Sequence, residues 1–578
     1  MKGLAPMSIP KLSSKSKRNS TVTGSRYIAE TLHAYGVDHV FFMDAVLRRT
    51  LAECGTVGIR RILAHSEKGA AYMADGYARA SGRVAVVMAQ SVGAANLAAG
   101  LQDARLFGTP IVAFTGRHIA NNQYSNAYQE LPHEPMFSAF VKASYRVDVP
   151  EQLPRLMRQV FRDAASGPCR PVHLDVSGNT GSVTDFTELV MDDIVEPEYG
   201  RVPAQRPVAD DRQIARAQDV LASAARPVLV AGAGVVMSRA EEAVRALAEK
   251  TSMPVLASLD AKAVMIEDHP LFGGVVGTYS YHCANKLLAE ADVVLFVGCD
   301  TGDQMTNNFT LPRPGTATIQ IDIDPLELGR NFAGCVGIHA DPRTAVQQLT
   351  KALSASDRPA WRARLKTLVA EWRDYIATNM NSDMLPIRPE RICKELSEWL
   401  PKDAIVVADT GYASQWSGTM LALRHSGQRY FRAAGSLGWA FPAALGVKCA
   451  CPDRPVICFT GDGGMMYHLT ELETALRWNI RTITVVNNNS RLAQGLRNLT
   501  KAHKGIVGRM EDLFTYAPTN YAALAEAFGC TGIRVEKPAD LRPALERAAA
   551  ANQPVVIDVV SDPTVLADLP WTPSKDGI

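Results

Sequence analysis

The sequence has no excess of charge of one sign and no long apolar run. Among its 578 residues, 61 Lys and Arg balance 59 Asp and Glu, so the formal net charge is only +2. Such a chain has no overall attraction for nucleic acid or for an anionic membrane surface. Its longest apolar run, residues 227–237, is far shorter than the roughly 20 residues that span a bilayer. We therefore expect no nucleic-acid partner and no association with membranes.

Cysteine pairs with the spacing of disulfide frameworks or zinc sites are missing. The ten cysteines contain no CxxC motif, and the closest two are Cys449 and Cys451. Disulfides and a zinc site are therefore not expected. Free thiols are typical of a reducing compartment, and we predict a cytoplasmic protein.

The N-terminus lacks acidic side chains and lacks the apolar core of a secretory signal. It is rich in Ser and Lys. A transit peptide is one interpretation of this composition. We favour the other, a flexible tail over residues 1–23.

From residue 24 onward, helix-like segments alternate with short apolar strands. Apolar runs without strict alternation, separated by helices, are typical of parallel strands buried on both faces. The 47% hydrophobic content is that of a globular protein with a large core. Polar, Pro-containing stretches near 187–209 and 355–388 separate three such sets. We predict an α/β fold with three doubly wound parallel-sheet domains, at residues 24–186, 208–354 and 388–565.

The stretch GDGGMMYHLTELETALRWNIRTITVVNNNS (461–490) places polar groups at two strand ends. An apolar strand precedes it, helical spacing predicts a crossover helix over 465–478, and RTITVV predicts the next parallel strand. Asp462 and Asn489 should then lie side by side at the carboxyl edge of one sheet. Their oxygens suit Mg²⁺ or Ca²⁺ holding a phosphate. For GDG alone, a tight turn is the simpler interpretation.

This pattern resembles the thiamine diphosphate (ThDP) motif, which opens with GDG and closes with NN. The resemblance implies that Asp462, Asn489 and the carbonyl of Arg491 bind the metal. It also implies that Gly463 and Gly464 contact the diphosphate.

A second block, AHSEKGAAYMADGYARASGR, resembles the HEQGAxHMAEGYARASG stretch of acetohydroxyacid (acetolactate) synthases. An isolated glutamate at the start of a helix is usually stabilised only by the helix dipole. The resemblance instead implies that Glu67 hydrogen-bonds the aminopyrimidine ring and promotes removal of the C2 proton. NAYQE resembles the DAFQE of these synthases, which implies that Tyr128 and Gln129 lie near the thiazolium and the substrate.

The resemblance continues into the last third of the chain. GSLGWAFPAALG resembles GTMGxGLPAAIG, which implies that the Gly435 carbonyl accepts from the pyrimidine amino group and that Leu437 wedges the cofactor into a bent shape. DTGYASQW resembles DVGQHQMW, which implies diphosphate contacts from Gly411, Tyr412 and Ala413. In this family the first and third domains of different subunits face one cofactor. The resemblance therefore implies a homodimer or homotetramer with active sites between subunits.

The sequence departs from the family pattern at the expected substrate wall and in the middle domain. AQSVG stands where the synthases have TSGPG, so Gln90 and Ser91 are expected at that wall. GCDTGDQ (298–304) lacks both arginines that neighbour FAD in the synthases, so FAD is doubtful. FFMDAV replaces the usual GxPG-like loop of the family. The helix that follows the predicted metal ligands Asn489 and Arg491 lacks the tryptophan that shapes the acceptor pocket in the synthases. No HH pair occurs, which makes a simple decarboxylase the weaker interpretation.

Basic residues crowd the segment that follows the predicted metal ligands Asn489 and Arg491. A solvated face is one interpretation, and an anion-binding lid for a carboxylate, sulfonate or coenzyme-A-linked substrate is the other. The further candidate substrate contacts are Arg117, His118, Gln494 and Arg497.

The sequence therefore predicts a ThDP- and Mg²⁺-dependent carboligase or acyl-transfer enzyme acting on a 2-oxo acid such as pyruvate. Three alternatives stay open. They are a carbon–carbon lyase acting on a 2-hydroxy ketone or 2-hydroxyacyl thioester, a non-oxidative decarboxylase, and an inactive ThDP-binding homologue.

Overall fold

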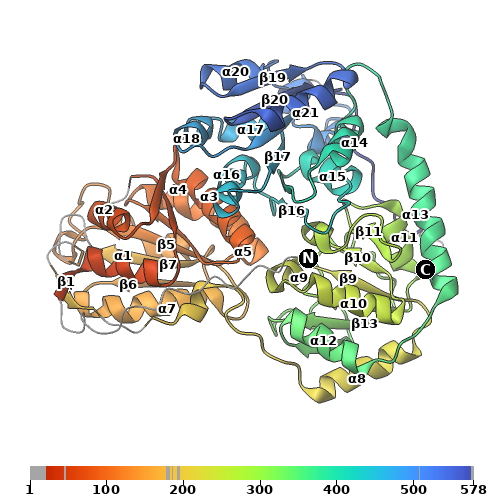
Figure 1. The fold of residues 1–578 in the computed structure, drawn as a ribbon, viewed down its shortest axis with the longest axis horizontal. Helices are drawn as coiled ribbons and strands as arrows, with labels where there is room; N and C mark the ends of the chain where they lie inside the picture. The colour runs from red at the N-terminus through yellow and green to blue at the C-terminus, as the bar shows by residue number, and fades with distance from the viewer. Residues whose placement is uncertain are drawn as a thin grey trace.

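The computed structural model describes residues 21–44, 47–177, 183–184, 187–191, 195–506 and 508–574 (Figure 1). Most of the predicted tail, residues 1–20, lies outside the described residues. Its last three residues were wrongly assigned to the tail, because Thr21–Thr23 form strand β1. This strand pairs antiparallel with β8 (Glu188–Val190), so the β-branched residues TVT join a sheet instead of extending into solvent.

The N-terminal domain contains a six-stranded parallel sheet in the order β3-β2-β4-β5-β7-β6. Its strands are β2 (His39–Phe42), β3 (Arg60–Leu63), β4 (Ala85–Ala89), β5 (Ile111–Arg117), β6 (Ala143–Val147) and β7 (Val172–Ser177). Its helices are α1 (Gly24–Ala34), α2 (Arg48–Thr56), α3 (Glu67–Ser81), α4 (Gly93–Gly100), α5 (Gln102–Phe107), α6 (His133–Phe137) and α7 (Leu153–Ala165). The inner strands β4 and β5 are buried along their whole length, which explains their continuous apolar sequence.

The central domain contains a second parallel sheet, in the order β11-β10-β9-β12-β13-β14. Its strands are β9 (Pro227–Ala231), β10 (Val255–Ala257), β11 (Phe272–Val275), β12 (Val293–Val297), β13 (Ala317–Asp322) and β14 (Val336–His339). Its helices are α8 (Asp211–Ser223), α9 (Ala233–Ser238), α10 (Glu241–Thr251), α11 (His282–Glu290), α12 (Pro342–Ala352) and the 3-10 segment η4 (Leu259–Val264). This strand order is that of a doubly wound dinucleotide-binding fold.

The C-terminal domain repeats the strand order of the N-terminal domain, as β16-β15-β17-β18-β20-β19. Its strands are β15 (Ile405–Ala408), β16 (Arg429–Arg432), β17 (Val456–Gly461), β18 (Ile483–Asn488), β19 (Thr531–Val535) and β20 (Val555–Val560). Its helices are α14 (Pro389–Trp399), α15 (Tyr412–Met420), α16 (Ala440–Ala450), α17 (Asp462–Tyr467), α18 (Glu471–Arg477), α19 (Leu496–Ala502), α20 (Tyr521–Ala527) and α21 (Leu541–Ala550). The predicted fold of three parallel-sheet domains is confirmed.

Two local predictions need correction. The expected crossover helix over 465–478 is broken into α17 and α18, because His468 leaves the helical conformation at φ −136°. Glu471, the first residue of α18, accepts a hydrogen bond from the backbone N–H of His65 at 3.0 Å. The stretch 355–388, interpreted as a polar separator, contains the 22-residue helix α13 (Pro359–Met380). Figure 1 shows α13 running along one side of the molecule, between the central and C-terminal domains.

Helices α3 and α16 join the N-terminal and C-terminal domains within one chain. Their backbones touch where glycines face them: a Cβ added at Gly76 would lie 2.1 Å from the carbonyl oxygen of Ala443. A Cβ at Gly446 would lie 1.8 Å from the carbonyl oxygen of Met73. Only glycine permits this approach, so the sequence fixes both helices in close contact.

Candidate active site

Asp462 and Asn489 lie together at the carboxyl edge of the C-terminal sheet. Strands β17 and β18 pair in parallel, with Gly461 opposite Asn487, and Asp462 begins α17 directly after β17. The backbone N–H of Arg491 donates to Asp462 Oδ2 at 3.2 Å and to Asn489 Oδ1 at 3.0 Å. The structure thus brings the three predicted metal-site residues to one point.

The Asp462 carboxylate is buried, with 3% of the residue exposed. Burial raises its pKa to about 6, although the N–H groups of Gly463, Ser490 and Arg491 stabilise the charged form. Among the described residues, no Lys, Arg or His side chain lies within 4 Å of this carboxylate. A bound cation would supply the missing positive charge.

Two helices begin at this edge, and glycines shape both starts. Gly411, at φ +67°, precedes α15, whose first residues Tyr412 and Ala413 are buried. Gly463 and Gly464 form the first turn of α17. Helix N-termini present free N–H groups and a partial positive charge, so both can bind the oxygens of an anion.

The edge leaves open space beside a half-buried apolar side chain. A Cβ added at Gly435 or at Gly461 would meet no atom within 4 Å. Leu437, two residues after Gly435, is half-buried. A ligand can therefore approach the backbone here without displacing protein atoms.

Glu67 begins α3 in the N-terminal domain, after the N-cap Ser66, whose hydroxyl accepts from the N–H of Gly69. Asn96 on α4 donates to Glu67 Oε2 at 3.1 Å. A Cβ at Gly93 would lie 2.2 Å from Glu67 Oε1. The carboxylate is thus held against the start of α4. Gly93 and Asn96 were not predicted, because nothing in their spacing links them to Glu67.

Four predicted residues form one loop cluster in the N-terminal domain. The Ser91 hydroxyl donates to the carbonyl of Gln129, and the His118 imidazole Nε2 is hydrogen-bonded to the carbonyl of Tyr128. Gln129 adopts φ +63°, a backbone conformation that residues other than glycine rarely adopt and that is concentrated at functional sites. Gln90 precedes Ser91 and is half-buried. The structure does not join this cluster to Asp462 by any contact among the described residues.

Comparisons with known proteins match this architecture domain by domain. Family models match residues 22–136 (thiamine pyrophosphate enzyme, N-terminal TPP binding domain), 214–349 (thiamine pyrophosphate enzyme, central domain) and 409–559 (thiamine pyrophosphate enzyme, C-terminal TPP binding domain). The chain belongs to the thiamine pyrophosphate enzyme family. Its cofactors are ThDP (thiamine pyrophosphate) and a divalent metal.

Several relatives of this chain are named acetolactate synthase large subunits. The probable acetolactate synthase large subunit of Methanocaldococcus jannaschii is 31% identical, with 93% of this chain and 92% of the relative covered. The acetolactate synthase large subunit of Corynebacterium glutamicum is 30% identical, with 93% and 87% covered. The acetolactate synthase isozyme 2 large subunit of Escherichia coli is 28% identical, with 94% and 96% covered. The predicted resemblance to acetolactate synthases is confirmed.

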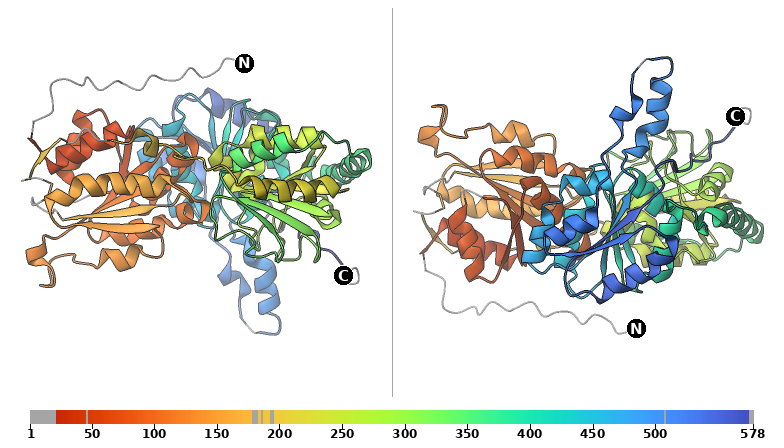
Figure 2. Two further views of the ribbon diagram at one scale, coloured as in Figure 1. Left: turned by 90° about the horizontal axis from the view of Figure 1, so that it is seen from below. Right: turned by 90° about the horizontal axis from the view of Figure 1, so that it is seen from above.

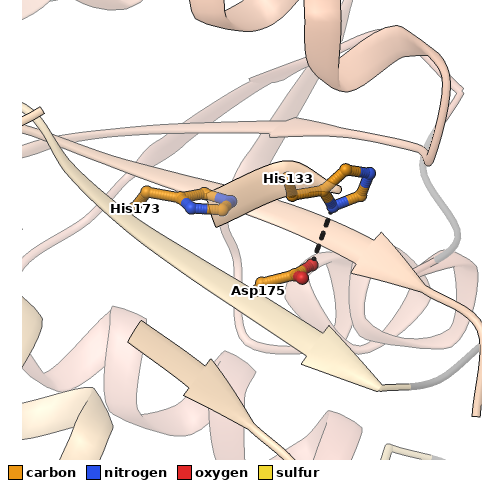
Figure 3. Close-up of side chains that lie close together, drawn as sticks. All are labelled: His133, His173 and Asp175. Carbon is orange, nitrogen blue, oxygen red and sulfur yellow. Dashed lines mark hydrogen bonds and ion pairs between the residues drawn. The ribbon is translucent and has the colours of Figure 1, made fainter. Parts of the chain in front are cut away.

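A buried polar network supports the loop cluster of this family member (Figure 3). His133 donates from Nε2 to the Ser91 carbonyl at 3.0 Å and lies 3.1 Å through Nδ1 from Asp175 Oδ1. The Thr115 hydroxyl lies 2.8 Å from Asp175 Oδ1 and 2.7 Å from His173 Nε2. Burial lowers the pKa of His173 to about 3, so this ring is neutral.

The same three side chains, His133, His173 and Asp175, have potential metal-ligand atoms within 4.8 Å of one another. The Thr115 hydroxyl lies between them and is within hydrogen-bond distance of all three. Arg117 also lies 3.2 Å from Asp175. Hydrogen bonds and this ion pair account for the cluster without a metal. The sequence did not predict it, apart from Arg117.

The basic segment after the metal loop includes α19 and projects from the body of the molecule (Figure 2). Arg497 donates to the carbonyl of Ala567 at 2.6 Å, and the Arg491 side chain donates to the carbonyl of Pro563 at 3.1 Å. Gln494 contacts the Tyr279 hydroxyl. Lys501 is exposed at the end of α19. Arg497 therefore fastens the C-terminal segment, whereas Lys501 is open to a ligand.

A cavity of about 840 Å³ lies at the carboxyl edge of the central sheet, where doubly wound folds with this strand order bind dinucleotides, and residues of the other two domains complete its lining. Seven carboxylates line it, against three arginines. Burial raises the pKa of one of them, Asp322, to about 7. An acidic lining does not fit the diphosphate of FAD, in agreement with the missing arginines of the loop 298–304.

In the described part of the chain, no helix is both long and apolar enough to cross a bilayer. All ten cysteines are free thiols.

Proposed function

We propose that this enzyme is a ThDP- and Mg²⁺-dependent carboligase that passes the acyl unit of a 2-oxo acid such as pyruvate to an acceptor, as the name of its relatives implies. The observation that carries the proposal is the buried Asp462 carboxylate beside Asn489, at the tips of adjacent strands and next to two helix N-termini. We propose the cytoplasm as its location, since all of its thiols are free.

The sheet edge would hold the cofactor. Asp462, Asn489 and the carbonyl of Arg491 offer three hard oxygen ligands, which suit Mg²⁺. N–H groups at the starts of α15 and α17 would bind the diphosphate. When bound, ThDP supplies a nucleophilic carbon and an electron sink for loss of CO₂ from a 2-oxo acid.

Glu67 would hold a proton next to the aminopyrimidine ring. Its half-buried carboxylate is held by a hydrogen bond from Asn96 and by packing against Gly93. A carboxylate placed in this way can donate a hydrogen bond when protonated and accept one when charged. The conservative variant Glu67→Gln keeps the shape but not the proton transfer.

The loop cluster would position the substrates. Gln129, with Tyr128, presents polar groups from a strained loop, and Gln90, Ser91, Arg117 and His118 surround it. Fixing the reacting groups in one geometry lowers the entropic barrier for joining two carbonyl compounds. Leu437 would support the bend of the cofactor beside the open backbone at Gly435.

The proposal includes assembly into a homodimer or homotetramer with active sites between subunits. This assembly is supported by apolar side chains beside the carboxyl edge of the C-terminal sheet that carries Asp462 and Asn489, called the metal edge below. Met466, Tyr467, Leu492, Leu513 and Tyr516 are all exposed in the single chain. Apolar patches of this kind mark interaction surfaces, and a second copy of the chain would cover them.

Product analysis tests the proposed reaction directly. The purified protein is incubated with ThDP, Mg²⁺ and either pyruvate or a panel of other 2-oxo acids and 2-hydroxyacyl compounds, and products are identified by mass spectrometry. Acetolactate from pyruvate is the expected result. Glu67→Ala serves as the negative control, and full activity in that variant would contradict the assigned role.

A carbon–carbon lyase running related chemistry in reverse is the second candidate, favoured by the exposed cations around α19. Cleavage of a 2-hydroxyacyl substrate without synthesis from pyruvate would identify it. Charge reversal in Lys501→Glu should raise KM for an anionic substrate, with kcat little changed, because the Lys501 side chain has no partner among the residues that the structure describes. Unchanged kinetics in this variant would contradict the hypothesis that the basic segment is an anion-binding lid.

A further inference from the structure

A large basic cavity lies where all three domains of the chain meet, apart from the metal edge. Its volume is about 1120 Å³. Its lining includes the end of α3 at Ala80, the start of α10 at Glu241, and the C-terminal-domain segment 423–431. Small-molecule sites usually measure about 300–1,000 Å³, so the cavity is slightly larger than this range and has room for a small ligand together with water.

The lining carries more positive than negative charge. The carboxylates are Glu241 and Glu242, and the cations are Arg239, Arg245, Lys402, Arg424, Arg429 and Arg454. With the histidines neutral, six cations minus two anions leave a net charge of +4. A water-filled cleft with one sign of charge concentrates ligands of the opposite sign.

Three of these arginines are oriented by main-chain carbonyls. Arg429 donates to the carbonyls of Ala80 at 2.8 Å and Arg79 at 3.2 Å, at the end of α3. Arg239 donates to the carbonyl of Ser81 at 3.0 Å.

Arg454 is held in the same way, by the carbonyls of Asp403 at 2.7 Å and Gly427. A carbonyl fixes a guanidinium without neutralising it. Within the described residues, no carboxylate lies within 4 Å of Arg239, Arg429 or Arg454.

The three charges repel one another. The pKa of Arg429 is lowered to about 10, mainly by burial and further by Arg454 and Arg239. Burial also raises the pKa of the nearby Glu241 carboxyl, which weakens one of the two acidic groups in the lining that could compensate. An anion bound in the cavity would relieve this repulsion.

Arg239 also joins the cavity to a second one. Its backbone adopts φ +52° at the end of α9, which is a strained conformation for a residue other than glycine. The second cavity, of about 700 Å³, is lined by Arg239, Arg343 and Lys351 together with Glu242. The strained residue thus lies between two basic compartments.

We infer that this cavity binds a small multivalent anion carrying phosphate groups, held by Arg239, Arg429 and Arg454. Guanidinium groups match phosphate oxygens in planar, bidentate geometry. Because the lining comes from all three domains, the bound anion links them and stabilises their arrangement. The inference does not depend on the reaction that the enzyme performs.

Calorimetric titration with inorganic pyrophosphate tests the inference. The protein is first saturated with excess ThDP and Mg²⁺, so that the cofactor site is occupied, and free Mg²⁺ and ionic strength are held constant. We expect one pyrophosphate per chain, bound roughly tenfold more tightly than sulfate, since two linked phosphates engage more arginines. No binding by the wild-type holoenzyme would overturn the inference.

Variants distinguish the cavity from other sites. Arg429→Gln and Arg454→Gln should weaken binding by roughly tenfold or more. Arg424→Gln is the matched control, because Arg424 lines the same cavity but is paired with Asp268 at 2.7 Å. Its effect should stay within about threefold.

A gain-of-binding variant covers the case in which the arginine variants fail to fold. Glu242 is exposed on α10, and Glu242→Gln should tighten pyrophosphate binding by about threefold, because it removes a repelling charge. Equal affinity in wild type and Glu242→Gln, or in wild type and Arg429→Gln, would contradict the proposed site.

Discussion

The two sides of the candidate active site are built in different ways. The metal edge of the C-terminal domain uses residues at the tips of buried parallel strands, and its carboxylate has a pKa raised by burial. The N-terminal side uses a helix start and loops, in which half-exposed groups are held by hydrogen bonds to main-chain carbonyls. The proposed ion ligands thus lie on the sheet, whereas the proposed substrate contacts lie on loops that can vary without disturbing it.

The largest expected effect follows from removing the charge of the metal edge. In Asp462→Asn, we expect Mg²⁺-dependent ThDP binding to be lost and activity to fall by roughly three orders of magnitude, because the anionic ligand is gone. The protein without cofactor should be at least as stable as wild type, since a buried charge is removed. Titration with ThDP and thermal unfolding measure the two quantities. Asp453→Asn on the surface is the control, and unchanged ThDP binding in Asp462→Asn would show that the edge is not the metal site.

A smaller effect is expected on the N-terminal side. Glu67→Gln should lower kcat by roughly a hundredfold or more, because proton transfer is lost. ThDP binding should change only a few-fold, since the metal edge is intact. The control is Glu134→Gln, an exposed glutamate of the same domain. If Glu67→Gln abolished ThDP binding while leaving the turnover of bound enzyme unchanged, the division of roles between the two sides would be wrong.

The network behind the loop cluster should have a weaker, indirect effect. In Asp175→Asn, His133 loses its charged partner, so the Ser91 carbonyl and the Gln129 loop are held less firmly. We expect kcat/KM to fall by roughly tenfold, mainly through KM, with ThDP binding unchanged. Asp148→Asn is the matched control, because Asp148 pairs with the same Arg117 but does not contact His133. Equal losses in both variants would point to Arg117 instead.

The smallest expected effect is on the pH dependence of the free energy of unfolding. The pKa of His173 is lowered to about 3 in the folded chain by burial, whereas an unfolded histidine titrates near pH 6.5. The unfolded state therefore binds the extra proton first, so stability is full above about pH 6.5 and is lost as pH falls toward 3. Between pH 7 and pH 5.5 this amounts to about 1 kcal/mol.

Urea unfolding of His173→Asn at both pH values checks this contribution. The variant should lose less stability on acidification than wild type. His33→Asn, at an exposed position, should retain the wild-type dependence. The same pH dependence in His173→Asn and wild type would contradict burial of a neutral ring.

The sequence predicted that Asp462 and Asn489 lie close together because both stand next to strand ends, where chain order and space coincide. It did not predict the network of Thr115, His133, His173 and Asp175. These residues are isolated in the sequence, and only the pairing of β5 with β7 and the return of α6 bring them together. Single polar residues inside apolar strands carry no spacing that could reveal a shared partner.

Helix α13 was missed for a different reason. Trp361, Leu365, Leu368 and Trp372 recur at helical spacing and are buried, so the signal was present. Charged residues between them and prolines at both ends of the stretch made it look like a linker. The break between α17 and α18, by contrast, lies at His468, inside a stretch whose apolar spacing continues without interruption, so the local pattern does not show it.

The touching backbones of α3 and α16 restrict how the enzyme can move. With carbonyl oxygens pressed against Gly76 and Gly446, the first and third domains cannot slide past each other and must travel as one rigid body during turnover. We therefore expect opening for substrate entry and product release to come from the loops around Gln129 and α19 instead of a hinge between these domains.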